Sequence, residues 1–130
     1  MIPFIKAHAC GNDFLIVNEE DAAGFDKAEL TRALCERNTG IGADGVEFFC
    51  WTSDNSGRIR LHNADGSIAE ISGNGTRCVA AWMAEQKGAV EGDSLAIETD
   101  AGMRVCRVNR VTRDGAFTVE ITTGMGVPQF

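Results

Sequence analysis

The segment from Thr76 to Lys87, TRCVAAWMAEQK, constrains the fold more than any other part of the sequence. Its pattern predicts a helix, and residues 78–84 are apolar around almost the whole circumference. A helix of that kind is enclosed on most sides instead of lying on a surface. Gly88 follows it and supplies the residue that commonly ends a helix. The chain of 130 residues is long enough for one domain with a core of this sort.

Most of the remaining chain is predicted to form strands. A second helix is expected over Lys27–Arg37, with Asp26 as its N-cap and Glu29 at N3. About eight strands and two helices predict an α+β domain, with a curved, barrel-like mixed or antiparallel sheet wrapped around a central buried helix. We expect residues 1–130 to form this single domain. The expected strands are residues 4–7, 13–18, 46–51, 58–63, 67–71, 94–99, 103–109 and 116–122.

The residues just before the apolar helix, Ser72-Gly73-Asn74-Gly75, predict a tight elbow at the mouth of this barrel. The first amides of a helix have no acceptor within it, and the positive end of the helix dipole lies behind them. Such a site binds an anion, either a phosphate or the carboxylate of an amino acid. Ser72 would occupy the place of a nucleophile or of a base that transfers protons.

Two further loops, residues 11–13 and 62–66, are also dense in asparagine and glycine. An asparagine side chain carries two donor hydrogens and an acceptor without charge, so it can bind the carboxylate and the ammonium of an amino acid. The alternative is that these residues only make turns. The elbow is the more specific signal, because it precedes a buried helix.

Composition excludes several classes of protein. The net charge of −7 and the absence of clustered Lys and Arg argue against nucleic-acid binding. No apolar run is long enough to span a membrane, and the N-terminus does not have the pattern of a signal peptide. We therefore expect a cytoplasmic protein. Five cysteines without a C-x-x-C pair argue against a disulfide framework or a zinc site. All but Cys10 are expected to be free and buried: Cys35, Cys50, Cys78 and Cys106.

Four ordered motifs together resemble those of the diaminopimelate epimerase family. They are HACGNDF (residues 8–14), GIGADG (40–45), NADGS (63–67) and GNGTRC (73–78). The resemblance covers the whole chain. It implies a fold in which each half of the enzyme is a sheet wrapped about a central helix, in agreement with the pattern above.

The resemblance also implies a mechanism and its residues. Enzymes of this family epimerise diaminopimelate without any cofactor and without a metal. Two cysteines, one from each half, face each other across the substrate; one removes the Cα proton and the other returns a proton on the opposite face. By resemblance, Asn12 and Asn63 contact the substrate, and the amides of Gly73 and Asn74 bind the carboxylate at the reacting centre.

The chain departs from the family at the catalytic position, which holds Ser72 where the motif has cysteine. A hydroxyl supplies no useful anionic base at neutral pH unless a general base assists it. His62 is one candidate for that partner, and a histidine in a solvated turn is the alternative. A displaced thiol from Cys10 is a further alternative.

The second departure is length. The resemblance ends at residues 124–130, which match the crossover into the second half of the family's fold. The other cysteine and the residues for the distal end of the substrate are therefore expected in a missing C-terminal half, or in a second copy of the chain.

The leading hypothesis is the N-terminal domain of a diaminopimelate-epimerase-like enzyme of lysine and peptidoglycan precursor synthesis, with little or no activity alone. One alternative is a related isomerase or dehydratase that acts on another amino or hydroxy acid. The other is a non-catalytic domain that binds a carboxylate or a partner protein.

Overall fold

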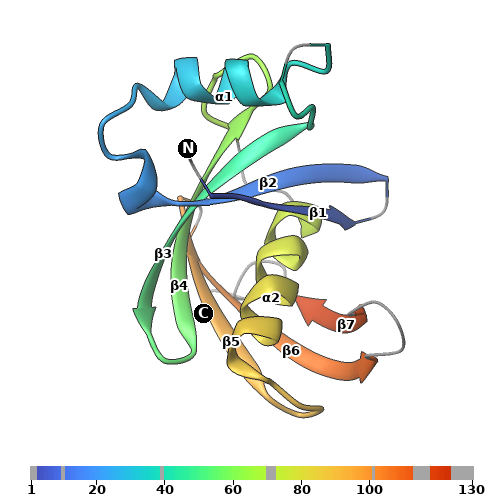
Figure 1. Ribbon diagram of the computed structural model, residues 1–130. Coiled ribbons are helices and arrows are strands. Elements are labelled where there is room, and N and C mark those ends of the chain that lie inside the picture. Colours follow the sequence, from blue (N-terminus) through green and yellow to red (C-terminus); the bar gives the residue numbers. More distant parts are fainter. Residues whose placement is uncertain are drawn as a thin grey trace.

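A single curled sheet and the helix that lies in its hollow form most of the molecule (Figure 1). The computed structural model describes residues 3–9, 11–38, 40–69, 73–100, 102–112 and 118–123. The helix in the hollow is α2 (Gly73–Lys87), and a second helix, α1 (Lys27–Cys35), covers the outer side of the sheet. The predicted α+β fold, with its sheet wrapped about a buried helix, is confirmed.

The strands lie in the sheet in the same order as in the sequence. All neighbours are antiparallel except β2 with β3 and β4 with β5. Parallel neighbours need a crossover connection, and α1 and α2 are these two crossovers. The strands are β1 (Ile5–Ala9), β2 (Asn12–Asn18), β3 (Gly45–Ser53), β4 (Ser56–Asn63), β5 (Ser94–Thr99), β6 (Gly102–Thr112) and β7 (Thr118–Thr123).

Alternate residues of the central strands pack on opposite faces of the sheet. Phe48 joins a core on the side of α1, whereas its neighbour Phe49 joins the core on the side of α2. Both phenylalanines are fully buried, as the two-residue period of a strand with both faces covered requires. The core on the α2 side includes Val79, Ala80, Met83 and Ala84 of the helix.

Helix α2 is enclosed as predicted. It begins at Gly73, three residues before the expected start, so the glycines of the elbow form its first turn. It ends at Lys87 as expected, and Gly88 has a φ of 62°. The Ala89 amide then donates to the carbonyl of Ala84. No helix among the described residues is long and apolar enough to cross a membrane.

Helix α1 has the predicted N-cap, since the Asp26 carboxylate accepts from the Glu29 amide at 3.1 Å. It ends at Cys35, two residues before the expected end, because Glu36 is extended. The chain then folds back, and the Gly40 amide donates to the Glu36 carbonyl at 2.8 Å. A short 3₁₀ helix, η1 (Glu19–Ala22), was not predicted.

The predicted strand over residues 67–71 is wrong for residues 67–69. A single bridge pairs Ile68 with His62, and the Ile68 side chain is exposed. The Asp65 carboxylate closes the preceding turn by accepting from the Ser67 amide at 2.9 Å. After this turn the Asn63 amide donates to the Ser67 carbonyl and the Ala69 amide to the Leu61 carbonyl, which gives one bridge to β4 and no longer strand. The described sheet therefore has seven strands instead of about eight.

Candidate functional site

The asparagine-rich loops meet at one end of the sheet. Gly45, the first residue of β3, is in register with Phe14 of β2 on one side and with Asn63 of β4 on the other. Asn12 is the first residue of β2 and Asn63 is the last of β4. The two asparagines expected to contact substrate are therefore at the same end of β2 and β4, the strands on either side of β3.

The start of α2 lies at this end as well. Cys78, on the second turn of the helix, packs in a buried cluster with Phe14 and Leu61. Gly73 and Asn74 are the first residues of α2, so their amides have no acceptor within the helix. Ser72 and Cys10, on which the chemical predictions fall, lie outside the described residues.

The turn that carries Asn63 is held by its own hydrogen bonds. The Asn63 amide donates to the Ser67 carbonyl at 2.8 Å, and its side-chain Nδ2 donates to Ser67 Oγ at 3.1 Å. The Ser67 hydroxyl and amide both donate to Asp65, and these bonds lower the pKa of the Asp65 carboxyl. Asn63 therefore makes a turn, and its position at the end of β4 leaves it exposed.

The prediction that His62 is a histidine in a solvated turn is wrong. It lies in β4 and is 5% exposed, and its Nδ1 is 3.0 Å from the Gly66 carbonyl oxygen. Its ring meets that of Phe48 edge-on, with 5.3 Å between centroids. Because Phe48 packs on the α1 side, His62 points away from α2. This placement gives no support to His62 as the general base of a residue that directly precedes α2.

A cluster of charges joins two of the loops. Asp13 and Asp44 exchange hydrogen bonds, each amide donating to the other's carboxylate at 3.0 Å. Arg37 Nη2 lies 3.2 Å from an oxygen of each carboxylate, and Lys6 Nζ lies 3.3 Å from Asp13. The Arg37 guanidinium, with Lys6, holds the pKa of Asp13 well below its ordinary value. The Asp13 carboxylate is therefore ionised at neutral pH.

A buried glutamate lies near this end of the sheet. Glu47 is fully buried on the α2 face of β3, in register with Ile16 and Leu61. Neither of its carboxyl oxygens has a hydrogen-bond partner among the described residues. Burial raises the pKa of the Glu47 carboxyl well above its ordinary value.

Replacing Gly45 by alanine should destabilise the protein by about 1–3 kcal/mol, the usual cost of overpacking. A Cβ at Gly45 would lie 2.7 Å from the carbonyl oxygen of His62, so β4 would have to move at the residue before Asn63. Urea unfolding measures the effect. Gly24→Ala is the matched control, because a Cβ there meets nothing within 4 Å. Equal stability of the two variants would contradict this reading of the site.

The cysteines are mostly structural. Cys35, Cys78 and Cys106 are buried as predicted and lie in no disulfide, while Cys50 is only half-buried. Burial raises the pKa of Cys35 to about 11, so its thiol is unreactive at neutral pH.

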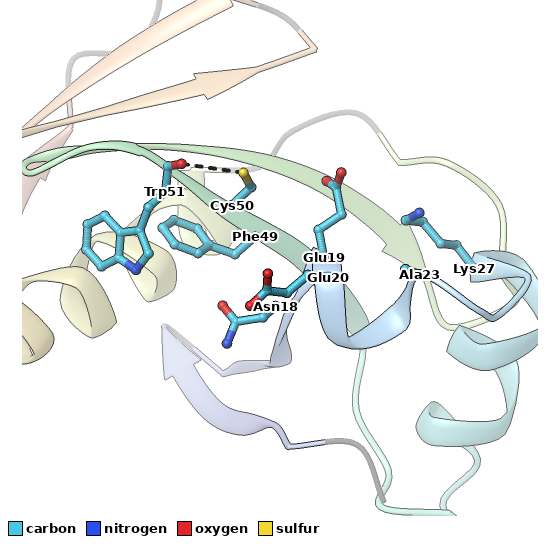
Figure 2. Close-up of a pocket in the computed structure, with 8 residues that line it drawn as sticks. All are labelled: Asn18, Glu19, Glu20, Ala23, Lys27, Phe49, Cys50 and Trp51. Atoms are coloured by element: carbon cyan, nitrogen blue, oxygen red, sulfur yellow. Dashed lines mark hydrogen bonds between the residues drawn. The ribbon is translucent and has the colours of Figure 1, made fainter.

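A separate cavity of about 560 Å³ lies at the opposite end of the same strands (Figure 2). Asn18, the last residue of β2, and Trp51, near the end of β3, both line it. Figure 2 shows side chains from η1 and β3 around it, with the Cys50 Sγ directed toward its neighbour's main chain. The motif residues do not line this cavity.

Sequence reasoning missed the charge cluster and the buried glutamate. The sequence pattern places Arg37 at the end of a predicted helix and Asp44 in a glycine-rich loop. Nothing in that pattern indicates that the two side chains form an ion pair. Glu47 is the one charged residue in the apolar stretch GVEFFC (residues 45–50), and a lone carboxylate in such a stretch could have indicated a buried glutamate.

Comparison with known proteins gives a consistent result. The family model described as diaminopimelate epimerase matches residues 4–130. A diaminopimelate epimerase of Methanocaldococcus jannaschii is 39% identical and covers 98% of this chain. One from Methanothrix thermoacetophila is 40% identical and covers 99%. The chain spans 43% and 45% of the length of these two relatives.

Solved structures share the fold at low identity. A predicted epimerase from Pseudomonas aeruginosa has a TM-score of 0.67 at 14% identity, over 93% of this chain and 42% of its own. A hydroxyproline epimerase from Agrobacterium vitis has a TM-score of 0.65 at 18% identity, over 94% of this chain and 41% of its own.

Proposed function

The chain belongs to the diaminopimelate epimerase family, and from that premise we propose that it is the N-terminal half of a cofactor-independent amino-acid epimerase. Its substrate is diaminopimelate, which is converted from the LL to the meso form in lysine and peptidoglycan precursor synthesis in the cytoplasm. Residues 1–130 act as one domain that binds the reacting end of the substrate.

One observation carries this proposal: the start of a buried helix lies at the sheet end where Asn12 and Asn63 are found. Removing a Cα proton next to a carboxylate builds up negative charge. Fixed N–H donors at a helix N-terminus stabilise that charge without reorganisation. We assign this role to the amides of Gly73 and Asn74, and substrate contact to the two asparagines.

The residue at the acid/base position of this chain is poorly suited to proton transfer. Ser72 directly precedes Gly73 in the sequence and takes the place of the motif cysteine. The helix terminus would lower the pKa of a thiol at that position and so favour a thiolate base. A hydroxyl is a much weaker acid, and we therefore expect little or no proton removal by the unmodified chain.

The second acid/base group is expected outside this chain. The relatives are about twice as long, and the proposed partner is either their missing C-terminal half or a second copy of this chain. Either would close over the substrate from the side opposite α2's start.

Turnover of diaminopimelate by the complete protein that carries this chain, with Ser72 replaced by cysteine, tests the proposed function. We expect epimerisation of diaminopimelate ahead of other amino and hydroxy acids, with no added cofactor or metal. Preferred turnover of a different acid would replace this assignment with a related isomerase or dehydratase. Tight binding of diaminopimelate without turnover would favour a non-catalytic carboxylate-binding domain.

A further inference from the structure

Asp44 is bound to two loops at once. Its amide donates to the Asp13 carboxylate at 3.0 Å, and its own carboxylate accepts from the Asp13 amide at 3.0 Å. Its main-chain carbonyl accepts from the Ala64 amide at 3.1 Å. Asp13 follows Asn12 in the sequence, and Ala64 follows Asn63. One residue is therefore linked to the immediate neighbours of both asparagines.

The link is stabilised by charge. Two carboxylates this close would repel each other, and Arg37 Nη2 bridges them at 3.2 Å from each. Lys6 adds a second cation at 3.3 Å from Asp13. The Asp13 side chain is only 13% exposed, so these contacts are partly shielded from solvent screening. Two cations thus balance two anions between the loops.

We propose that Asp44, acting with Asp13, is a positioning residue that fixes Asn12 and Asn63 relative to each other for binding an amino-acid substrate. This inference rests on the proposed function, which makes the two asparagines substrate contacts. Asp44 acts through the loops and is not required to touch the substrate. Binding groups must be held within about 0.5 Å of their productive placement, so a loosened loop lowers affinity even where the fold persists.

Asp44→Ala should weaken diaminopimelate binding by about tenfold, the effect of losing one hydrogen bond to a charged group. Asp44→Asn keeps a side-chain oxygen that can accept from the Asp13 amide, so it should recover most of the loss. Calorimetry on the complete protein gives the dissociation constants. If the alanine variant fails to fold, a loss of about threefold in Asp44→Asn, from removing the charge that Arg37 binds, is the expected result.

Asp100→Asn is the matched control. Asp100 also pairs with an arginine, Arg60, at 3.6 Å, and it lines a second pocket together with Glu19 and Lys27, which are not motif residues. It should leave the dissociation constant within about twofold of the wild-type value. The proposal is overturned if Asp44→Ala binds with wild-type affinity, or if the control loses as much.

A second readout needs no ligand and separates this inference from the proposed function. The Ala64 amide is bonded to the main chain of Asp44, which the alanine substitution leaves in place. Faster hydrogen exchange at Ala64 in Asp44→Ala is expected only if the side chain holds the loop. Unchanged protection at Ala64 would contradict positioning. If the unmodified protein does not bind diaminopimelate, the proposed function fails and this exchange result alone decides the positioning role.

Discussion

Replacing Ser72 by cysteine should raise the rate of Cα proton exchange of diaminopimelate by about 100- to 10,000-fold, the usual contribution of one positioned acid/base group. The expected cause is a thiolate whose pKa is lowered by the N-terminus of α2. The measurement is deuterium incorporation from D₂O by the complete protein, followed by mass spectrometry. Each base exchanges the Cα proton on its own face, so each stereoisomer of the substrate is tested separately, and the isomer that gains in Ser72→Cys reports on this half of the site.

Ser94→Cys controls for the presence of an added thiol, because Ser94 is an exposed residue at the start of β5. It should give no gain in exchange. Rapid exchange by the unmodified protein with the stereoisomer whose Cα proton faces residue 72 would show that Ser72 is not a poor base. No gain from Ser72→Cys would remove the assignment of this position as the acid/base residue.

Replacing Glu47 by leucine should stabilise the protein at pH 7 by about 1–3 kcal/mol, the usual cost of burying a polar group that has no hydrogen-bond partner. Glu47 is fully buried beside apolar neighbours and its carboxyl has no partner among the described residues. Leucine fills a similar volume and has no polar atoms to desolvate. Urea unfolding gives the difference in the free energy of unfolding.

The gain should depend on pH. Burial raises the pKa of Glu47 in the folded state, so the folded protein keeps this proton where the unfolded chain has lost it. Stability from this group is present below the unfolded pKa of about 4.3 and falls as pH rises toward the folded value. Glu47→Leu removes that fall, so the difference between variant and wild type should widen from pH 5 to pH 8.

Glu98→Gln is the control for this series, since Glu98 is an exposed glutamate of β5. It should change the free energy of unfolding by no more than about 0.5 kcal/mol. A Glu47→Leu variant that is less stable than wild type at pH 7 would mean that the carboxyl has a binding partner and a role of its own.

The enclosed helix and the curled sheet could be predicted because the apolar run at 78–84 requires burial on most sides. The rest of the chain has mainly strand patterns, so a sheet curved about the helix was the arrangement that could bury it. The start of α2 was placed three residues late, because glycines that suit a turn also occupy a first helical turn. The strand expected at 67–71 is reduced, over residues 67–69, to a single bridge with His62 that follows the turn closed by Asp65.

The candidate site could be predicted in part. Loop motifs identified Asn12 and Asn63, and the structure brings both to one end of the sheet. The ion cluster of Asp13, Arg37 and Asp44 could not be predicted, because it joins residues that are up to 31 positions apart. The burial of His62 could not be predicted for a related reason. His62 lies near the end of β4, and whether that position is buried depends on α1, which packs over this face of the sheet.

The most direct test of the central claim is to map diaminopimelate binding by backbone amide NMR on the ¹⁵N-labelled protein. We expect the largest shifts at Gly73 and Asn74, with further shifts at Asn12 and Asn63. Shifts confined to the cavity end of the sheet, at Asn18 and Trp51, would contradict the claim, as would the absence of any shift at saturating ligand.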